Sequence, residues 1–247
     1  MKKSYQTKTN SKYISERKKH LKKYFALSDL GQIVDTFPKY VKRQEMTRLI
    51  ARFYLFEKIK NIQGSIIECG VYNGNGIFSW AHLSSIIEPV GGFFREIYGF
   101  DTFEGFPSVH SKDKKKIKWK SGDLKATSKF KEIQETIKLF DKNRFLNQKS
   151  KIKLIKGDFN KTAEKFIKDN PHLLVSLLFL DFDIYEPTRK ALEIFLPRMS
   201  KGSIIVFDQI NHEMWPGETM ALLEQMNIKN YKIEKFNFEI NMSYIVL

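Results

Sequence analysis

The feature that most constrains this chain is a short apolar run that ends in an acidic residue and opens into glycines, IIECGVYNGNG at residues 66–76. Such a run predicts a buried strand, a tight turn and the start of a helix. Gly70 lets the backbone turn, while Gly74 and Gly76 remove Cβ atoms where a ligand or the strand approaches closely. The dinucleotide pattern G-x-G-x-x-G is absent, because the spacing is E-x-G-x-x-x-G-x-G. The stretch indicates a nucleotide-type pocket other than an NAD site, and an ordinary strand-to-helix turn is the simpler alternative.

Further apolar runs, each followed by a helical pattern, predict more strands at residues 97–100, 152–155, 173–180 and 203–207. Repeated strand-then-helix units predict a parallel sheet with right-handed crossovers and helices on both faces. Lys201 and Gly202 are expected to turn the chain into the last of these strands. Alternating segments at residues 231–238 and 241–247 predict a final antiparallel pair. The expected fold is therefore α/β and Rossmann-like, with a mostly parallel seven-stranded sheet.

The chain is expected to divide into a basic arm at residues 1–43 and one domain at residues 44–247. The polar residues 1–10 are expected to be disordered, and the segment that follows to residue 25 is predicted to be helical. From residue 44, apolar residues recur at helical spacing and predict a helix before the first strand. A polar, lysine-rich stretch at residues 109–129 predicts an insertion of the kind that forms lids or substrate loops.

The formal charge of +15 and the pI near 9.6 raise the question of nucleic-acid binding. The basic clusters contain lysine rather than arginine and lack interleaved aromatic residues, so a solvated surface is favoured and nucleic acid is not an expected partner. No apolar run approaches the roughly 20 residues that span a membrane. The amino terminus lacks the apolar stretch of a secretory signal, and Cys69 has no partner for a disulfide. We therefore expect residence in the cytoplasm.

Acidic residues stand at the carboxyl ends of the predicted strands, where parallel sheets bind their ligands. They are Glu68, Asp101, Asp158, Asp181, Asp183 and Asp208. A single acid in this position is commonly a helix cap. A row of them on one edge repels itself unless a cation or hydroxyl donors are present. The row predicts a binding site.

Two kinds of ligand suit these acids. Asp101, after the second strand, is placed to accept the two hydroxyls of a ribose. Asp181 and Asp208, after neighbouring strands, are candidate ligands of Mg²⁺, to which Gln209 would add a carbonyl oxygen. Asp183 is then free to act as a general base, and His212 is an alternative base whose simpler interpretation is a surface histidine.

Several motifs in this order resemble the macrocin O-methyltransferase family over roughly residues 44–226. They are ECGVYNGNG, YGFDTFEGFP, KGDF, LDFDIYEPT and VFDQ followed by WPGE. The resemblance implies the class I methyltransferase fold, and enzymes that use S-adenosylmethionine (SAM) and Mg²⁺ to methylate sugar hydroxyls on antibiotics and related glycosides. Because relatives commonly self-associate, it also implies a homo-oligomer.

Carried over by motif, the resemblance implies roles for individual residues. Asp183 and Asp181 would be catalytic, and Asp181, Asp208 and Gln209 would hold the metal. SAM would be bound by Glu68, Gly70, Val71, Tyr72, Gly74, Gly76, Asp101, Thr102, Asp158 and Phe159. Gln209 stands where the family carries a second acid, and a neutral amide is a weaker ligand for a hard cation.

The expected function is methyl transfer from SAM to a hydroxyl of a small, sugar-containing acceptor. Methylation of base amino groups is disfavoured, because no N-P-P-Y or D-P-P-Y tetrad is present. Two alternatives stay open: an RNA ribose 2′-O-methyltransferase, and a non-catalytic SAM-binding module.

Overall fold

The computed structural model describes residues 8–26, 29–113 and 119–247. The expected disorder of residues 1–7 and the lysines within residues 114–118 lie outside this part of the chain. Residues 8–10, also expected to be disordered, instead begin a helix. The chain divides into two compact units, one ending at Arg48 and one spanning Leu49–Leu247, whereas the sequence placed this boundary at residue 43.

The first unit contains α1 (Lys8–Phe25), α2 (Leu30–Asp35) and a short 3-10 turn (Phe37–Lys39). Asp29 caps α2 by accepting a hydrogen bond from the backbone N–H of Gln32. The Arg17 guanidinium donates to the carbonyl of Tyr40 over 2.8 Å, and the rings of Phe25 and Tyr40 lie 5.0 Å apart. The next helix, α3 (Arg43–Ile59), runs through the division into the second unit.

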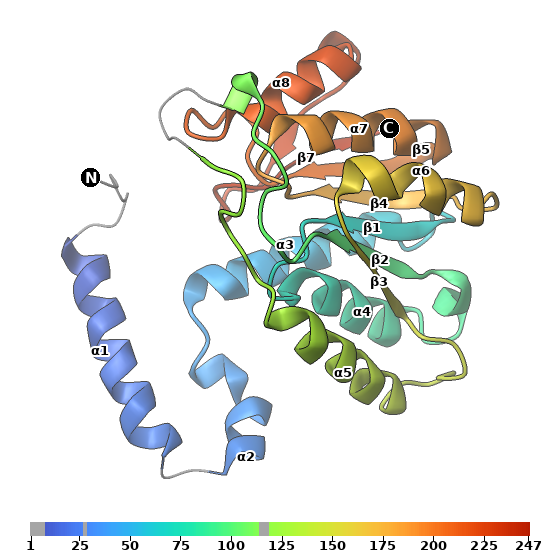
Figure 1. Cartoon of the computed structure of the whole chain (residues 1–247). Coiled ribbons are helices and arrows are strands. Elements are labelled where there is room, and N and C mark those ends of the chain that lie inside the picture. The colour runs from blue at the N-terminus through green and yellow to red at the C-terminus, as the bar shows by residue number, and fades with distance from the viewer. Residues whose placement is uncertain (1–7, 27–28, 114–118) are drawn as a thin grey trace. The chain divides into compact units, whose positions relative to one another are not determined.

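The second unit is built on a seven-stranded sheet in the order β3-β2-β1-β4-β5-β7-β6 (Figure 1). Its strands are β1 (Ser65–Cys69), β2 (Ile97–Asp101), β3 (Ile152–Lys156), β4 (Val175–Leu180), β5 (Met199–Phe207), β6 (Glu234–Lys235) and β7 (Ser243–Val246). The pairs among β1 to β5 are parallel, and β7 runs antiparallel to both β5 and β6. The predicted fold class is confirmed, because the strand order reverses at β1 and the sheet ends in an antiparallel pair.

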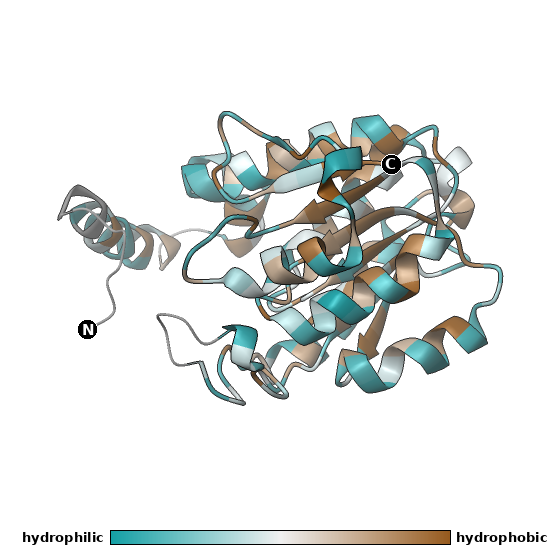
Figure 2. Ribbon diagram, turned by 90° about the horizontal axis from the view of Figure 1, so that it is seen from above, coloured by the Kyte–Doolittle hydropathy of each residue, from teal (hydrophilic) through white to brown (hydrophobic). Residues whose placement is uncertain are grey.

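Helices cover both faces of this sheet. They are α4 (Asn75–Ile87), α5 (Lys129–Lys142), α6 (Phe159–Asp169), α7 (Tyr185–Phe195) and α8 (Pro216–Gln225), together with the second-unit part of α3. Core residues of α3, α4 and α5 pack on one face, and those of α6, α7 and α8 pack on the other. Figure 2 shows hydrophobic strands between helices that carry hydrophilic segments. All residues of β1 and β4 are buried, as expected for central strands covered on both faces. Within the described residues, no helix is long and apolar enough to cross a membrane.

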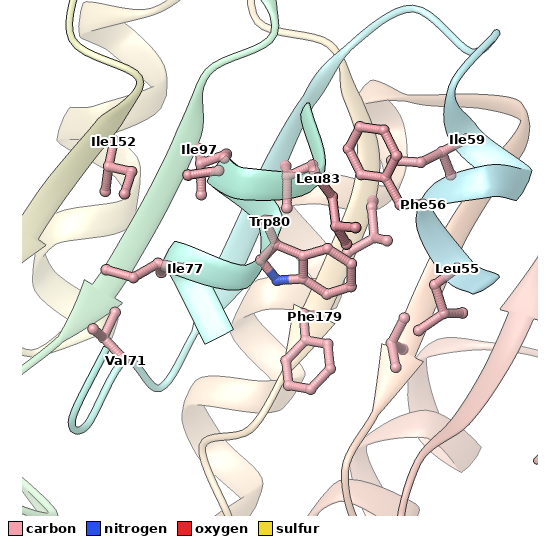
Figure 3. Packing of buried hydrophobic residues seen from close by; sticks show 14 of the residues in the cluster. Leu55, Phe56, Ile59, Val71, Ile77, Trp80, Leu83, Ile97, Ile152 and Phe179 are labelled. Carbon is pink, nitrogen blue, oxygen red and sulfur yellow. The ribbon is translucent and has the colours of Figure 1, made fainter. Parts of the chain in front are cut away.

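Trp80 of α4 forms the centre of one half of the core (Figure 3). Its ring lies 6.0 Å from that of Phe179 in β4. Its indole N–H donates to the carboxylate of Glu68 over 2.7 Å, which satisfies a buried acid and a buried donor together. Cys69 lies on the other face of β1 and is fully buried, and burial raises the pKa of its thiol.

Two strand boundaries differ from the sequence expectation. Lys201 and Gly202, predicted as a turn, lie inside β5, because the pairing with β4 jumps from Val175↔Met199 to Leu177↔Ile204. The extra residues form an irregularity in which Gly202 adopts a φ of 88°. The strand predicted at residues 231–238 is shorter than expected. Only the two residues of β6, Glu234 and Lys235, pair with β7.

Candidate active site

Backbone hydrogen bonds hold the carboxyl ends of the central strands side by side. The N–H of Gly70 donates to Phe100, that of Asp181 to Cys69, and that of Asp208 to Leu180, over 2.9, 2.8 and 3.1 Å. The parallel ladder thus continues one residue beyond each strand. This extension brings the backbones of the predicted acidic positions onto one edge, which we call the carboxyl edge.

The glycine turn after β1 is shaped by close backbone contacts. Gly70 has a φ of 96°, and a Cβ there would lie 2.0 Å from the carbonyl oxygen of Asp181. A Cβ on Gly76 would lie 2.2 Å from Oε1 of Glu68. The side chain of Glu68 therefore lies against the start of α4. It is 2% exposed, and it supports the turn from within the core.

A cavity of about 290 Å³ opens at the carboxyl edge. Its lining residues are Gly70, Tyr72, Asp101, Thr102, Gly105, Phe106, Pro107, Leu124, Gly157, Asp158, Phe159, Asp181, Phe182, Asp183, Ile184 and Pro187. The structure thus brings most of the predicted site residues around one space. Outside this lining lie Glu68, Val71, Gly74, Gly76, Asp208 and Gln209, which belong to the adjoining turn and strand end.

Asp101 fastens two loops to each other. Its Oδ2 accepts the backbone N–H groups of Val71 and Tyr72 over 2.9 and 2.8 Å, and its Oδ1 accepts that of Phe103 over 2.6 Å. Tyr72 and Phe103 both have positive φ, at 49° and 56°. The carboxylate therefore stabilises strained backbone around the cavity that it also lines. The sequence predicted Asp101 as a site residue, but it did not predict these three hydrogen bonds to the backbone.

Asp158 and Phe159 begin α6 at the cavity wall. Asp158 is the N-cap and accepts the backbone N–H of Asn160 over 3.1 Å. The ring of Phe159 is buried against those of Phe100 and Phe182, each about 5.1 Å away. A cap and a packing anchor thus line the cavity at the start of α6.

Asp181 and Asp183 follow β4, and Asp183 has an unusual backbone. Its φ is 63°, the left-handed region that aspartate tolerates better than most residues. Such a conformation persists where the surroundings enforce it, and it is frequent at functional sites. The half-buried Asp183 is thus presented on a constrained turn at the cavity.

The predicted metal position has a mixed donor set. Asp208 is 4% exposed, and the Nε2 of Gln209 lies 3.4 Å from its Oδ2. The Oε1 of Gln209 is buried and has no hydrogen-bond partner among the described residues. Over the same residues, no group of three or more His, Cys, Asp or Glu side chains is placed to hold a metal. The donors near β4 and β5 are therefore carboxylates plus one buried amide oxygen, all hard ligands.

Glu218, in the first turn of α8, is a buried acid beside the site that sequence reasoning missed. Its side chain is fully buried, its Oε2 accepts the backbone N–H of Gln209 over 2.9 Å, and its Oε1 is buried with no hydrogen-bond partner among the described residues. Burial, followed by the charge of Asp208, raises the pKa of Glu218 well above its usual range. The available signal was the WPGE motif, in which this acid stands.

The roof of the cavity is formed by two segments that pair with each other. Phe106 donates its backbone N–H to Asp123, and Gly122 donates to Phe106, over 3.0 and 2.9 Å. Further along, Ala126 donates to Phe103. Phe106 and Leu124 face the cavity from this roof. The loop after β2 and the end of the predicted insertion therefore form one layer.

The described part of the insertion packs on α7 and α8. Asp113 is 3% exposed and accepts the backbone N–H of Tyr185 over 2.8 Å. Lys112 forms an ion pair with Glu224 and donates to the hydroxyl of Tyr185. The rings of Trp119 and Trp215 stack 4.2 Å apart. The insertion, predicted as a lid or substrate loop, is thus attached to the helices beside the cavity.

A family model described as macrocin-O-methyltransferase (TylF) matches residues 38–234. A curated relative from Streptomyces olivaceus is 24% identical over 151 residues, which are 60% of this chain and 53% of the relative. That relative is 8-demethyl-8-(2,3-dimethoxy-alpha-L-rhamnosyl)-tetracenomycin-C 4′-O-methyltransferase, and the aligned part spans about half of its length.

Solved structures match over nearly the whole chain. CalS11, a calicheamicin methyltransferase, is 26% identical with a TM-score of 0.90, over 98% of this chain and 94% of the other. An apo structure of CalS11, described as TDP-rhamnose 3′-O-methyltransferase, is 24% identical with a TM-score of 0.82, over 98% and 96%. The likeness includes the arrangement of the sheet that forms the carboxyl edge.

Proposed function

Because the chain belongs to the macrocin-O-methyltransferase family, we propose that it transfers a methyl group from SAM to a hydroxyl of a small, sugar-containing molecule. The observation that carries this proposal is the cavity at the carboxyl edge, where a glycine turn meets Asp101, Asp158, Asp181 and Asp183. In open α/β sheets this is where ligands bind. Its acidic lining suits hydroxyl groups and a sulfonium cation.

We assign the donor half of the cavity to the glycine turn and α6. Gly70 and Tyr72 would flank the methionine and ribose part of SAM, and Asp158 would lie near the adenine. Asp101 lines the same space, and each carboxylate oxygen has lone pairs beyond those used by the backbone N–H groups. It would accept the ribose hydroxyls while it holds the turn.

We assign proton removal to Asp183. In direct transfer the acceptor oxygen forms a bond to the methyl carbon as the carbon–sulfur bond breaks, and the sulfur leaves as a neutral thioether. The hydroxyl proton passes to the Asp183 carboxylate, so charge and atoms balance. The constrained backbone of Asp183 supports this role, because a fixed base needs little reorganisation at the moment of transfer.

We further propose that Mg²⁺ binds beside this base, held by Asp181, Asp208 and Gln209. The buried amide oxygen of Gln209, without a hydrogen-bond partner among the described residues, supports a cation as its ligand. When bound, Mg²⁺ would lower the pKa of an alcohol and orient its oxygen. With two carboxylates and one amide, the affinity for metal is expected to be modest.

For the acceptor, we propose a hydroxyl on a deoxysugar. The names of the relatives support this class, because one acts on a rhamnosyl tetracenomycin and another on TDP-rhamnose. The two names differ in whether the sugar is joined to an aglycone or to a nucleotide. A panel that contains both types of rhamnoside would separate them.

The first test is calorimetry with SAM and S-adenosylhomocysteine, with and without Mg²⁺. Binding of both is expected, and failure of SAM to bind would overturn the proposal. The second test is transfer of labelled methyl groups to the rhamnoside panel and to RNA. Transfer to RNA that weakens steeply with salt would favour the ribose 2′-O-methyltransferase. SAM binding without transfer to any acceptor would favour the non-catalytic module. Residence in the cytoplasm and self-association remain predictions.

A further inference from the structure

Helix α7 begins directly after the turn that carries Asp183, and it has no cap of its own. Its N-cap residue is Ile184, whose side chain makes no capping hydrogen bond, and its first backbone N–H belongs to Tyr185. The first N–H groups of a helix have no partner within the helix. An acceptor for the N–H of Tyr185 therefore comes from outside α7.

Asp113 of the insertion supplies this acceptor, although it lies 72 residues earlier in the chain. Its Oδ1 accepts the N–H of Tyr185 over 2.8 Å, and its Oδ2 accepts that of His110 over 3.1 Å. A carboxylate in this position is also stabilised by the dipole of the helix. Asp113 thus caps α7 from a distant segment, as an aspartate at the N-cap position would do locally.

The start of α8 packs against the same carboxylate. A Cβ on Gly217 would lie 2.3 Å from Oδ1 of Asp113 and 2.5 Å from the backbone nitrogen of Tyr185. Only glycine fits such a contact. Asp113 is 3% exposed, so little water competes for its hydrogen bond to Tyr185.

The side chain of Tyr185 is held by the same part of the insertion. Lys112 donates to the Tyr185 hydroxyl over 3.0 Å, and this hydroxyl donates to Glu224 of α8. The backbone nitrogen and the hydroxyl of Tyr185 are therefore both fixed, two residues after Asp183.

The backbone of Asp183 requires fixed neighbours. Its left-handed φ of 63° is costly, and such a conformation persists only where the surroundings enforce it. Before it, the N–H of Asp181 donates to Cys69 over 2.8 Å and anchors the turn to β1. After it, the bond from Tyr185 to Asp113 anchors the turn to the insertion. The turn of the proposed base is thus held at both ends.

We propose that Asp113 is a positioning residue for proton transfer: by capping α7, it fixes the end of the turn that presents Asp183 to the acceptor hydroxyl. The inference rests on the proposed function of Asp183 as the base. It gives the insertion a part in the reaction, because Asp113 belongs to the insertion and not to the strands that form the carboxyl edge.

The experiment is a double-mutant cycle of Asp113→Ala and Asp183→Asn, with Asp113→Asn as the conservative variant. Asparagine keeps an acceptor oxygen for the N–H of Tyr185, whereas alanine removes it. The control is Asp141→Ala. Asp141 accepts the N–H of Lys151 over 3.1 Å and the hydroxyl of Ser150 over 2.7 Å, and it lies outside the lining of the cavity.

The readouts are the SAM dissociation constant, kcat and KM for the acceptor, and amide hydrogen exchange at Tyr185. This amide is a specific reporter, because an N–H at the start of a helix is protected only by a partner outside the helix. We expect it to be protected in the wild type and to exchange faster in Asp113→Ala.

Asp113→Ala should lower kcat by about 10- to 100-fold, as expected for a small misplacement of a reacting group. SAM affinity should change little, because the donor half is assigned to other residues. Asp113→Asn should retain part of the lost kcat, and Asp141→Ala should lose stability but keep its kcat. If Asp113 acts through Asp183, the kcat of the double variant should lie within about threefold of that of Asp183→Asn alone.

Equal fractional losses of kcat with and without the Asp183 carboxylate would overturn the inference, because Asp113 would then act independently of the base. An unchanged kcat in Asp113→Ala, or fast exchange of the Tyr185 amide in the wild type, would overturn it as well. If Asp183→Asn itself keeps the wild-type kcat, the proposed base is wrong and the inference fails with it, while the exchange of Tyr185 still shows whether the cap exists. Should Asp113→Ala not fold, Asp113→Asn takes its place in the cycle.

Discussion

Buried charged side chains have different partners at the two ends of the parallel strands: the carboxyl edge described above, and the opposite end of the same strands, which we call the amino edge. At the carboxyl edge, Asp101 is held by backbone N–H groups, which bring no opposite charge to the carboxyl group. At the amino edge, charged side chains pair with each other. Arg95 donates to Glu88 over 2.7 Å, and Lys149 and Lys153 pair with Glu96 over 2.9 and 2.6 Å.

This difference separates a binding edge from a supporting edge. Neutral donors fix the position of a carboxylate and keep its charge available for a ligand. Ion pairs cancel the charge and hold the chain together. At the amino edge, burial works against the ionised form of Glu96, but hydrogen bonds from Lys153, Tyr98 and Lys149 lower its pKa overall. The ion pairs therefore leave little uncompensated charge at the amino edge to attract a ligand.

The largest expected effect is that of Asp183→Asn on turnover. Asparagine tolerates the left-handed backbone as aspartate does, so the loop should keep its shape. Loss of a general base lowers kcat by about 10²–10⁴-fold, while SAM affinity should change little. Steady-state kinetics and calorimetry measure both. An unchanged kcat would show that Asp183 is not the base, and His212→Asn would then test the alternative.

Arg95→Met tests the supporting edge. Arg95 also donates to the carbonyl of Gly64 and to the hydroxyl of Ser176, and it is 8% exposed. Removing one partner of a buried ion pair costs about 3–5 kcal/mol, so urea unfolding should show a loss of this size with no change in SAM affinity. Arg189→Met, which removes an exposed pair on α7, should cost less than about 1 kcal/mol. A change in SAM affinity in Arg95→Met would contradict the separation of the edges.

Asp101→Asn is expected to lower both the stability of the protein and its affinity for SAM. Asparagine has one acceptor oxygen, so the N–H groups on one side of the carboxylate would face an amide NH₂. We expect a loss of stability of about 1–3 kcal/mol, together with SAM binding weaker by at least about tenfold. The comparison with Arg95→Met is decisive, since both variants should be less stable than the wild type, whereas only Asp101→Asn should bind SAM more weakly. Unaltered SAM affinity would exclude Asp101 from the donor site.

Lys151 is the exception at the amino edge and gives the smallest effect. Its ammonium group donates to the carbonyl of Gly92 rather than to a carboxylate, and burial lowers its pKa to about 8. The unfolded chain, with a pKa near 10.4, binds more protons between these values, so stability contributed by this group rises with pH there. From pH 7 to 9.5 the gain is about 1–2 kcal/mol. The measurement is urea unfolding of wild type against Lys151→Met across this range. A constant difference between the two would contradict the buried position of the ammonium.

The strands and the acids at their ends could be predicted from sequence because both have local signals. Apolar runs such as residues 173–180 predict central strands, and parallel topology alone places the residues that follow them on one edge. The boundaries were less accurate. The Lys201–Gly202 pair has the composition of a turn, and only its pairing partner in β4 shows that it lies in an irregular strand.

The residues that hold the site could not be predicted, because their partners are distant in the chain. Glu218 reads as an ordinary acid in the first turn of a helix, and its bond to Gln209 depends on how closely α8 approaches the sheet. Asp113 lies in a lysine-rich stretch that reads as solvated surface, yet it is buried against Tyr185. Such contacts arise from tertiary packing, which periodicity does not encode.

The burial of Cys69 has a practical consequence for studying how the roof moves. The chain contains one cysteine, and it lies at the centre of the sheet with no exposed surface and a raised thiol pKa. Such a thiol reacts slowly with maleimides and methanethiosulfonates, because these reagents attack the exposed thiolate. Thiol reagents should therefore label the wild-type protein very slowly. A cysteine placed at Leu124, which is 45% exposed in the roof, would carry a fluorophore or spin label without removal of the native one.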